Sequence, residues 1–362
     1  MSIIIFLFVL FILVLVHEWG HFIVAKKTGM RVDEFGIGFP PKLFGVKKGE
    51  TEYTFNALPI GGFVKIFGEN YEDVGPASEE DSRGFSSRPK WAQALVLVAG
   101  VTMNILFAWF LFSLTYMIGV QTPVDESQAS ESAELYITGV LPDSPAAKLP
   151  PGSRITAVEY EDRKIVGPDA SEFSNLITEA GDKQVTLTYE YAGDETSVGI
   201  TPVQGLIETD PDKFIVGTSL SMVDVVKKPF FTAIGDGFTS TLEGLVAIAS
   251  GLFNLIKEAL VGEADFTQVA GPVGIVGMVG DAASFGFTTL LTFTAIISLN
   301  LAVINLLPFP ALDGGRLVFV IIETITGKRI PPEWAGRVNL VGFAILMLLM
   351  IAVTYNDIVR LL

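Results

Sequence analysis

Long apolar stretches separated by polar segments dominate this chain of 362 residues. Each of four stretches can cross a hydrocarbon core as a helix, which takes about 20 residues; they lie at about 3–25, 91–118, 285–307 and 338–356. Half of the residues are hydrophobic and only 18% are charged. The pattern predicts a polytopic α-helical membrane protein with four transmembrane helices, and it excludes a simple soluble protein.

The first apolar stretch is predicted to be a retained membrane helix and not a secretory signal peptide. No basic residue precedes it, because the first lysine is Lys26, and no small-residue cleavage site closes it.

The polar segment 26–90 contains a predicted glycine- and proline-rich loop over Phe35–Pro41. Thr51–Phe67 has β character, and Gly61 and Gly62 are predicted to break it into a hairpin or a bulge. Two interpretations remain open. The segment is either a small surface hairpin or a sheet edge that pairs with an extended substrate beside an active site.

The segment 122–205 is predicted to form a separate α+β module. A strand over 135–141, a short helix over 171–179 and a hairpin over 184–191 and 196–201 follow one another. This order resembles a circularly permuted PDZ domain of the bacterial kind, and such domains bind peptide ends by strand addition.

Four regions therefore describe the predicted organisation. The membrane core is divided between 1–118 and 284–362, the PDZ-like domain is 122–205, and 206–283 connects them. The connector contains an apolar helical stretch with a basic start. It either lies along the membrane surface as an amphipathic helix or is an ordinary connecting helix.

Charge indicates the orientation and excludes one class of partner. Residues 119–285 hold 9 Lys and Arg against 25 Asp and Glu, whereas 26–90 and 316–337 together hold 14 against 12. Since basic loops favour the cytoplasm, the PDZ-like domain and both termini are predicted to be extracytoplasmic and the hairpin cytoplasmic. The net charge of −16 argues against nucleic acid as a partner.

The candidate chemistry begins at the end of the first apolar stretch. His17 and His21 are the only histidines of the chain, and they stand four residues apart with Glu18 beside the first. Residues with this spacing share one face of a helix, so the two imidazoles can bind one Zn²⁺ while Glu18 reaches a water on the open position. The alternative is a histidine pair satisfied by hydrogen bonds in a packed core.

A zinc ion held by two histidines needs a third protein ligand. The chain has no cysteine and no third histidine, so this ligand must be an oxygen, and Asp313 is the best candidate. Pro308 and Pro310 are predicted to break the third membrane helix just before it. Both ligand-bearing helices are predicted to run inward, which places the three groups at a similar depth near the cytoplasmic side.

Asn104 lies in the second apolar stretch, one helical turn after Gly100. The pair is interpreted either as a packing notch between helices or as a contact between Asn104 and the metal-binding helix.

Together these motifs resemble those of the site-2 proteases, in particular the bacterial regulator-of-sigma-E type. The resemblance covers essentially the whole chain. It is carried by the His17 motif, by the run from Asn305 through Pro308 and Pro310 to Asp313, and by the hairpin with Gly61 and Gly62.

The resemblance implies a zinc-dependent intramembrane endopeptidase of the bacterial inner membrane. Its implied substrate is a single-span membrane protein already trimmed by another protease, either an anti-sigma factor or a remnant signal peptide. Zinc-bound water would attack the peptide carbonyl with Glu18 as general base. Asn305 would help to hold the unwound substrate, the hairpin would clamp it, and the PDZ-like domain would screen for trimmed peptide ends.

The chain departs from this family in two ways. It has room for one PDZ domain, whereas many relatives carry two, and it reads Gly38-Phe39-Pro40-Pro41 where relatives often have Gly-Phe-Gly-Pro. Two other functions compete with the protease. One is a membrane scaffold with a structural metal, and the other is a metal transporter, which would need more ligands along a path than two histidines provide.

Overall fold

The computed structural model describes residues 2–69, 82–191, 193–206, 212–262 and 270–361. Contacts divide the chain into two units. Unit 1 contains residues 1–114, 231–283 and 289–362, and unit 2 contains 115–230 and 284–288.

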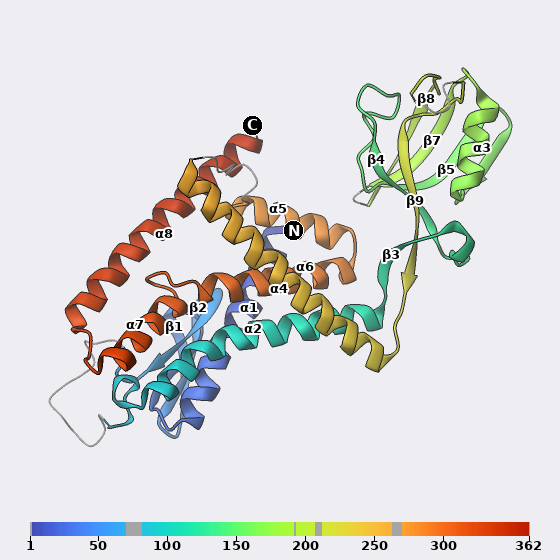
Figure 1. Ribbon diagram of the computed structural model, residues 1–362. Coiled ribbons are helices and arrows are strands. Elements are labelled where there is room, and N and C mark those ends of the chain that lie inside the picture. Colours follow the sequence, from blue (N-terminus) through green and yellow to red (C-terminus); the bar gives the residue numbers. More distant parts are fainter. Residues whose placement is uncertain (1, 70–81, 192, 207–211, 263–269, 362) are drawn as a thin grey trace. The chain divides into compact units, whose positions relative to one another are not determined.

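Unit 1 is a set of long helices with one curled β-sheet (Figure 1). Its helices are α1 (Ser2–Lys27), α2 (Lys90–Ile118, whose end belongs to unit 2), α4 (Phe230–Val261), α5 (Pro272–Ser284), α6 (Phe287–Leu306), α7 (Asp313–Thr326) and α8 (Pro332–Leu361). Among the described residues, five helices are long and apolar enough to cross a membrane: α1, α2, α4, α6 and α8. This is one more than predicted, because α4 also qualifies by length and composition.

The sheet of unit 1 consists of β1 (Val32–Lys48) and β2 (Thr51–Ile66), and each strand pairs in two halves. In the first half of β1, residues 34–39 pair with 52–58 on one side, and residues 32–37 pair with 62–66 on the other. The second half of β1, residues 42–48, pairs with the first half of β2 alone. Residues 62–66 therefore form one edge of the sheet, and residues 42–48 form the opposite edge.

The prediction of a loop over Phe35–Pro41 is wrong, because these residues belong to β1. The register shifts between the pairs Phe39–Leu58 and Lys42–Asn56, so Pro40 and Pro41 lie at an irregularity where no ladder N–H is required. Gly38 has φ +80°, and a Cβ there would lie 2.8 Å from the Leu58 carbonyl oxygen. Only glycine fits this position without strain.

The turn between β1 and β2 is fixed to the end of α1 through Glu50. Lys26 Nζ lies 2.6 Å from one carboxylate oxygen of Glu50, and Arg83 Nη1 lies 2.8 Å from the other. Hydrogen bonds from Arg83 and Lys26 lower the pKa of Glu50 to about 2. The sheet thus begins beside the C-terminal end of α1 and runs back along that helix.

Unit 2 is a sheet covered by one helix (Figure 1). Its strands are β3 (Val120–Val124), β4 (Glu134–Val140), β5 (Arg154–Tyr160), β6 (Arg163–Val166), β7 (Val185–Tyr191), β8 (Asp194–Ile200) and β9 (Thr218–Val226). The order is β3-β9-β4-β5-β7-β8, with β6 paired to β5. The helix α3 (Ala170–Ala180) begins with a capping box formed by Asp169 and Glu172.

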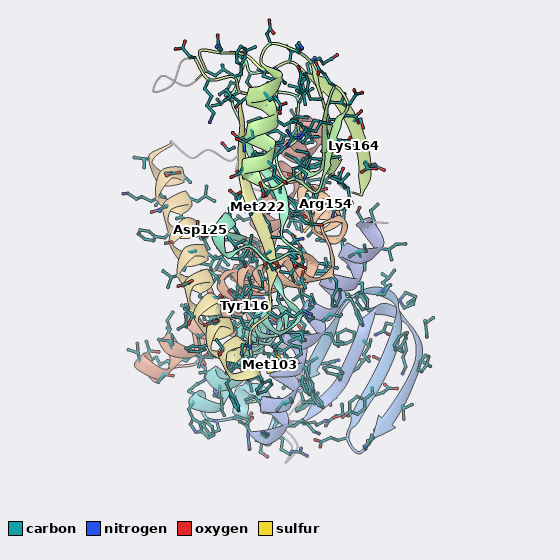
Figure 2. The ribbon with its side chains drawn as sticks, turned by 90° about the vertical axis from the view of Figure 1, so that its right-hand side faces the viewer. Met103, Tyr116, Asp125, Arg154, Lys164 and Met222 are labelled. Atoms are coloured by element: carbon teal, nitrogen blue, oxygen red, sulfur yellow. The ribbon has the colours of Figure 1, made fainter. Side chains whose placement is uncertain are left out.

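The sheet of unit 2 extends beyond the predicted 122–205 range, because β9 lies between β3 and β4. Met222 of β9 belongs to the same buried cluster as Leu176 of α3 and Leu187 of β7. Figure 2 labels Met222, together with Arg154 of β5, which forms ion pairs with Glu134 and Glu190. The strands predicted at 135–141, 184–191 and 196–201 and the helix predicted at 171–179 agree with β4, β7, β8 and α3.

A buried carboxylate joins the last helix of unit 1 to α5. Asp357 of α8 is 3% exposed, and its oxygens accept the N–H groups of Gly271 and Gly274 at 3.0 and 2.8 Å. A Cβ on Gly271 would lie 2.6 Å from an Asp357 oxygen. The absence of a side chain at Gly271 thus lets the Asp357 carboxylate approach the start of α5 closely.

Replacing Asp357 with Ala should lower the thermal unfolding midpoint of the protein in detergent by about 5 °C, because one buried and one partly buried N–H group lose their acceptor. Glu258→Ala removes an exposed carboxylate from α4 and should leave the midpoint unchanged. Equal midpoints for Asp357→Ala and the unsubstituted chain would show that this contact does not stabilise the fold.

Candidate active site

Three side chains converge where α1, α2 and the start of α7 meet. His17 Nε2 and His21 Nε2 lie 3.0 and 3.3 Å from one Asp313 carboxylate oxygen, and 3.1 Å from each other. Both histidines are buried, at 8% and 7% exposure. Among the described residues, these three are the group of His, Asp and Glu side chains that could hold a metal ion.

The spacing of these atoms fits a tetrahedral zinc ion. Ligands about 2.0–2.1 Å from Zn²⁺ at tetrahedral angles lie about 3.3 Å from one another. The three observed separations are 3.0, 3.1 and 3.3 Å. The set supplies two nitrogens and one oxygen, which leaves a fourth position open, as in catalytic zinc sites.

The other ring nitrogens of the histidines face α2. His21 Nδ1 lies 2.8 Å from the Val96 carbonyl oxygen, so it carries a proton and leaves Nε2 free to bind a metal. His17 Nδ1 lies 3.3 Å from the Asn104 amide. Both imidazoles are therefore oriented by α2.

Asn104 provides a second test of the fit to a metal. Its Oδ1 is buried and has no hydrogen-bond partner, while its Nδ2 faces His17 Nδ1. The oxygen and the nitrogen of a side-chain amide are assigned from their hydrogen-bond partners. Exchanging them would let Oδ1 accept the Nδ1 proton that His17 carries when its Nε2 binds a metal. A metal bound at His17 Nε2 would thus give the buried Asn104 oxygen a hydrogen-bond donor.

Asn104→Ala should weaken zinc binding about 10- to 100-fold, because His17 loses the group that fixes its ring. Zinc competition with a fluorescent chelator would measure the change. Asn300→Ala is a matched control, since Asn300 is a half-buried residue of α6 whose amide donates to the Ile296 carbonyl oxygen of its own helix. Unchanged zinc affinity in Asn104→Ala would contradict this role.

Two glycines allow α1 and α2 to approach at this site. A Cβ on Gly20 would lie 2.5 Å from the Ala99 carbonyl oxygen, and a Cβ on Gly100 would lie 2.4 Å from His21 Nε2. Gly100 thus provides the space that the two imidazoles occupy. Both interpretations of this pair therefore hold. Gly100 forms a packing notch between the helices, and Asn104 contacts His17 of the metal-binding helix.

The loop before Asp313 folds back on the start of α7. A Cβ on Gly314 would lie 2.2 Å from the Leu307 carbonyl oxygen, and a Cβ on Gly315 would lie 2.2 Å from that of Phe309. These glycines let the chain turn sharply after Pro308 and Pro310, so that Asp313 points back towards α1. Pro310 also contacts α8, where a Cβ on Gly342 would lie 2.5 Å from its ring.

Glu18 contacts the sheet rather than the three candidate ligands. Its Oε2 accepts the Val64 N–H at 3.1 Å, and Val64 belongs to the edge of the sheet formed by residues 62–66. Gly61 and Gly62 bring this edge against α1, since a Cβ on Gly61 would lie 2.8 Å from Val14. This contact was not predicted, because a backbone N–H leaves no signal in the sequence.

Asn305 lies half-buried near the end of α6, and Pro308 is exposed. No hydrogen bond among the described residues joins Asn305 to the candidate ligands. Ser298 of α6 donates instead to the Asn104 carbonyl oxygen at 2.8 Å, and so fixes α6 to α2. That Asn305 helps to hold the unwound substrate remains a prediction.

Comparisons with known proteins identify the family. The model of peptidase family M50 matches residues 5–349. A Clostridium perfringens protein named as a candidate zinc metalloprotease is 39% identical, over 96% of this chain and 95% of its own. The zinc metalloprotease RasP of Shouchella clausii is 30% identical over 98% of both chains. The regulator of sigma-W protease RasP of Bacillus subtilis is 29% identical over 99% of both.

Among solved structures, a PDZ domain of an SdrC-like protein from Listeria monocytogenes matches 24% of this chain and 85% of its own, at 20% identity and a TM-score of 0.21. That score is too low to support a conclusion. The family match and the relatives carry the assignment: this chain belongs to peptidase family M50, the site-2 proteases, and is a zinc metalloprotease of the membrane.

Proposed function

We propose that this protein hydrolyses a peptide bond in or near the transmembrane segment of a single-span membrane protein that another protease has already trimmed. The observation that supports this most strongly is the position of the site. His17 and His21 lie within the apolar helix α1, and Asp313 follows the apolar helix α6. Ionisable groups at such depth are costly unless they have a function.

In this proposal His17, His21 and Asp313 hold the zinc ion and Glu18 is the general base. Zinc supplies Lewis acidity, which makes a water nucleophilic near neutral pH. Glu18 takes the proton of the attacking water and passes it to the leaving amine. Asn104 and the Val96 carbonyl keep the two imidazoles in the tautomer that exposes Nε2.

Four membrane spans, α1, α2, α6 and α8, agree with this site, whereas a full crossing by α4 does not. His17 and His21 lie in the second half of α1, and Asp313 follows the end of α6, so these two helices must run in the same direction. A crossing by α4 would reverse α6 unless α5 crossed back. The 13 residues of α5 span only about 20 Å, less than the roughly 30 Å of a hydrocarbon core. We therefore place α4 along one face of the membrane.

The substrate is proposed to be an anti-sigma factor or a remnant signal peptide. The name of the Bacillus subtilis relative, a regulator of sigma-W protease, supports the first class. Loop charge supports a cytoplasmic active site and an extracytoplasmic unit 2. Unit 2 is proposed to bind the trimmed peptide end as a PDZ-like domain, with the sheet of unit 1 clamping the unwound segment.

The experiment that tests this function uses the purified full chain in detergent with two single-span reporters, one with its extracytoplasmic domain and one without it. The trimmed reporter should be cut within its apolar segment, as mapped by mass spectrometry, and a zinc chelator should stop the cut. Cleavage confined to soluble loops, or cleavage that survives the chelator, would exclude the proposed reaction. In cells, single-span fragments should accumulate when Glu18 is replaced by Gln.

A further inference from the structure

The general base occupies the place of a strand at the edge of the sheet. Residues 62–66 pair with residues 32–37 on one side, and no other strand of the described residues pairs with them. Their other side faces α1, and there the Val64 N–H donates to Glu18 Oε2 at 3.1 Å.

The distance is that of a strand-to-strand hydrogen bond. An added strand would lie about 4.8 Å from this edge, with a carbonyl oxygen about 2.9 Å from the Val64 nitrogen. The carboxylate of Glu18 holds that position. An extended peptide cannot pair with Val64 until Glu18 leaves it.

Gly61 and Gly62 keep the edge and the helix in this relation. A Cβ on Gly61 would lie 2.8 Å from Val14, and a Cβ on Gly62 would lie 3.4 Å from Leu15. Val14 precedes Glu18 by one helical turn and therefore lies on the same face of α1. The edge consequently runs along the helical face that carries the general base.

We propose that Glu18 and the substrate compete for the Val64 N–H, so that pairing of an extended substrate releases the general base. The proposal rests on the proposed function and deepens it by naming the group that recognises an unwound substrate. A helical segment has its carbonyls bonded within the helix, so it offers no acceptor to Val64 and leaves Glu18 in place.

The pairing also sets the register of the cut. Carbonyls of successive residues in a strand point to opposite sides. A residue whose carbonyl accepts the Val64 N–H therefore places the carbonyls of its two neighbours on the side away from the sheet. The scissile bond should lie directly beside the residue bonded to Val64.

A double-mutant cycle on binding tests the competition without cleavage. The full chain is stripped of zinc by a chelator, and a labelled Leu- and Ala-rich single-span peptide with a central Gly-Ser-Gly break is titrated by fluorescence anisotropy. Glu18→Ala should bind this peptide about 3- to 10-fold more tightly than the unsubstituted chain, because the competing acceptor is gone. Glu18→Gln keeps an acceptor oxygen and should gain less.

The gain should vanish when the N–H is removed. Val64→Pro lacks this donor, and proline is tolerated at a strand edge where the N–H points away from the sheet. Glu18→Ala should give no gain in the Val64→Pro background, and no gain for a peptide without the Gly-Ser-Gly break. An equal gain in both backgrounds, or no gain in the unsubstituted one, overturns the proposal.

Hydrogen exchange gives a second measurement should Val64→Pro fail to fold. The Val64 amide should exchange faster in Glu18→Ala than in the unsubstituted chain, and slower again once the peptide is bound. Unchanged protection of Val64 in Glu18→Ala overturns the competition. Because both readouts use zinc-free protein, failure to cleave a reporter would refute the proposed function without affecting this test.

Discussion

Glu18→Gln is expected to abolish cleavage while leaving zinc bound. The amide cannot accept the proton of the attacking water, and loss of a general base costs about 10²- to 10⁴-fold in rate. The candidate zinc ligands are His17, His21 and Asp313, and Glu18 contacts Val64 instead. Zinc content should therefore stay at that of the unsubstituted chain.

Turnover of the trimmed single-span reporter and zinc content by atomic emission should be measured on the same preparation. Glu333→Gln is a suitable control, because Glu333 is an exposed residue in the first turn of α8. If Glu18→Gln cleaved the reporter at the normal rate, Glu18 would not be the base. If the variant lost its zinc, Glu18 would also help to hold the metal, in addition to accepting the proton of the attacking water.

Gly100→Ala is expected to remove zinc and activity together. The added Cβ would lie 2.4 Å from His21 Nε2 and 2.7 Å from His17 Cε1, closer than non-bonded atoms approach. One methyl group would therefore displace the nitrogens that hold the metal. We expect zinc affinity to fall at least about 100-fold, the upper range for substitutions that disturb ligand orientation.

Gly277→Ala is the matched control, since it adds the same methyl group to the apolar helix α5 with no atom within 4 Å. Zinc content and the thermal midpoint in detergent should be measured for both variants. Normal zinc content in Gly100→Ala would mean that α1 and α2 separate easily. Gly100 would then have no part in seating the histidines.

Much of the candidate site could be inferred from local pattern. The spacing of His17 and His21 needs only the period of a helix, and the absence of cysteine and of a third histidine points to Asp313. Asn104 stands out in the sequence because it is a polar residue within an apolar stretch. These inferences succeed because they use residue types and short spacings.

The sheet was harder to predict. The glycines and prolines of 35–41 indicated a loop, yet the segment is part of β1, because the register shift leaves its prolines without a required donor. The PDZ-like range ended at 205, yet β9 at Thr218–Val226 lies inside that sheet. Strand pairing between distant segments decides both cases, and local propensity does not record it.

The sequence by itself determined the membrane character of the chain, the helix that carries the histidine pair, and the residue types able to bind zinc. Only the tertiary structure decided that Asp313 approaches His17 across 296 residues, that Gly100 makes room for both imidazoles, and that Glu18 is held by a strand edge. Helical periodicity is a property of neighbours along the chain. Contacts to a backbone N–H, or to the space above a glycine, exist only once distant segments have packed.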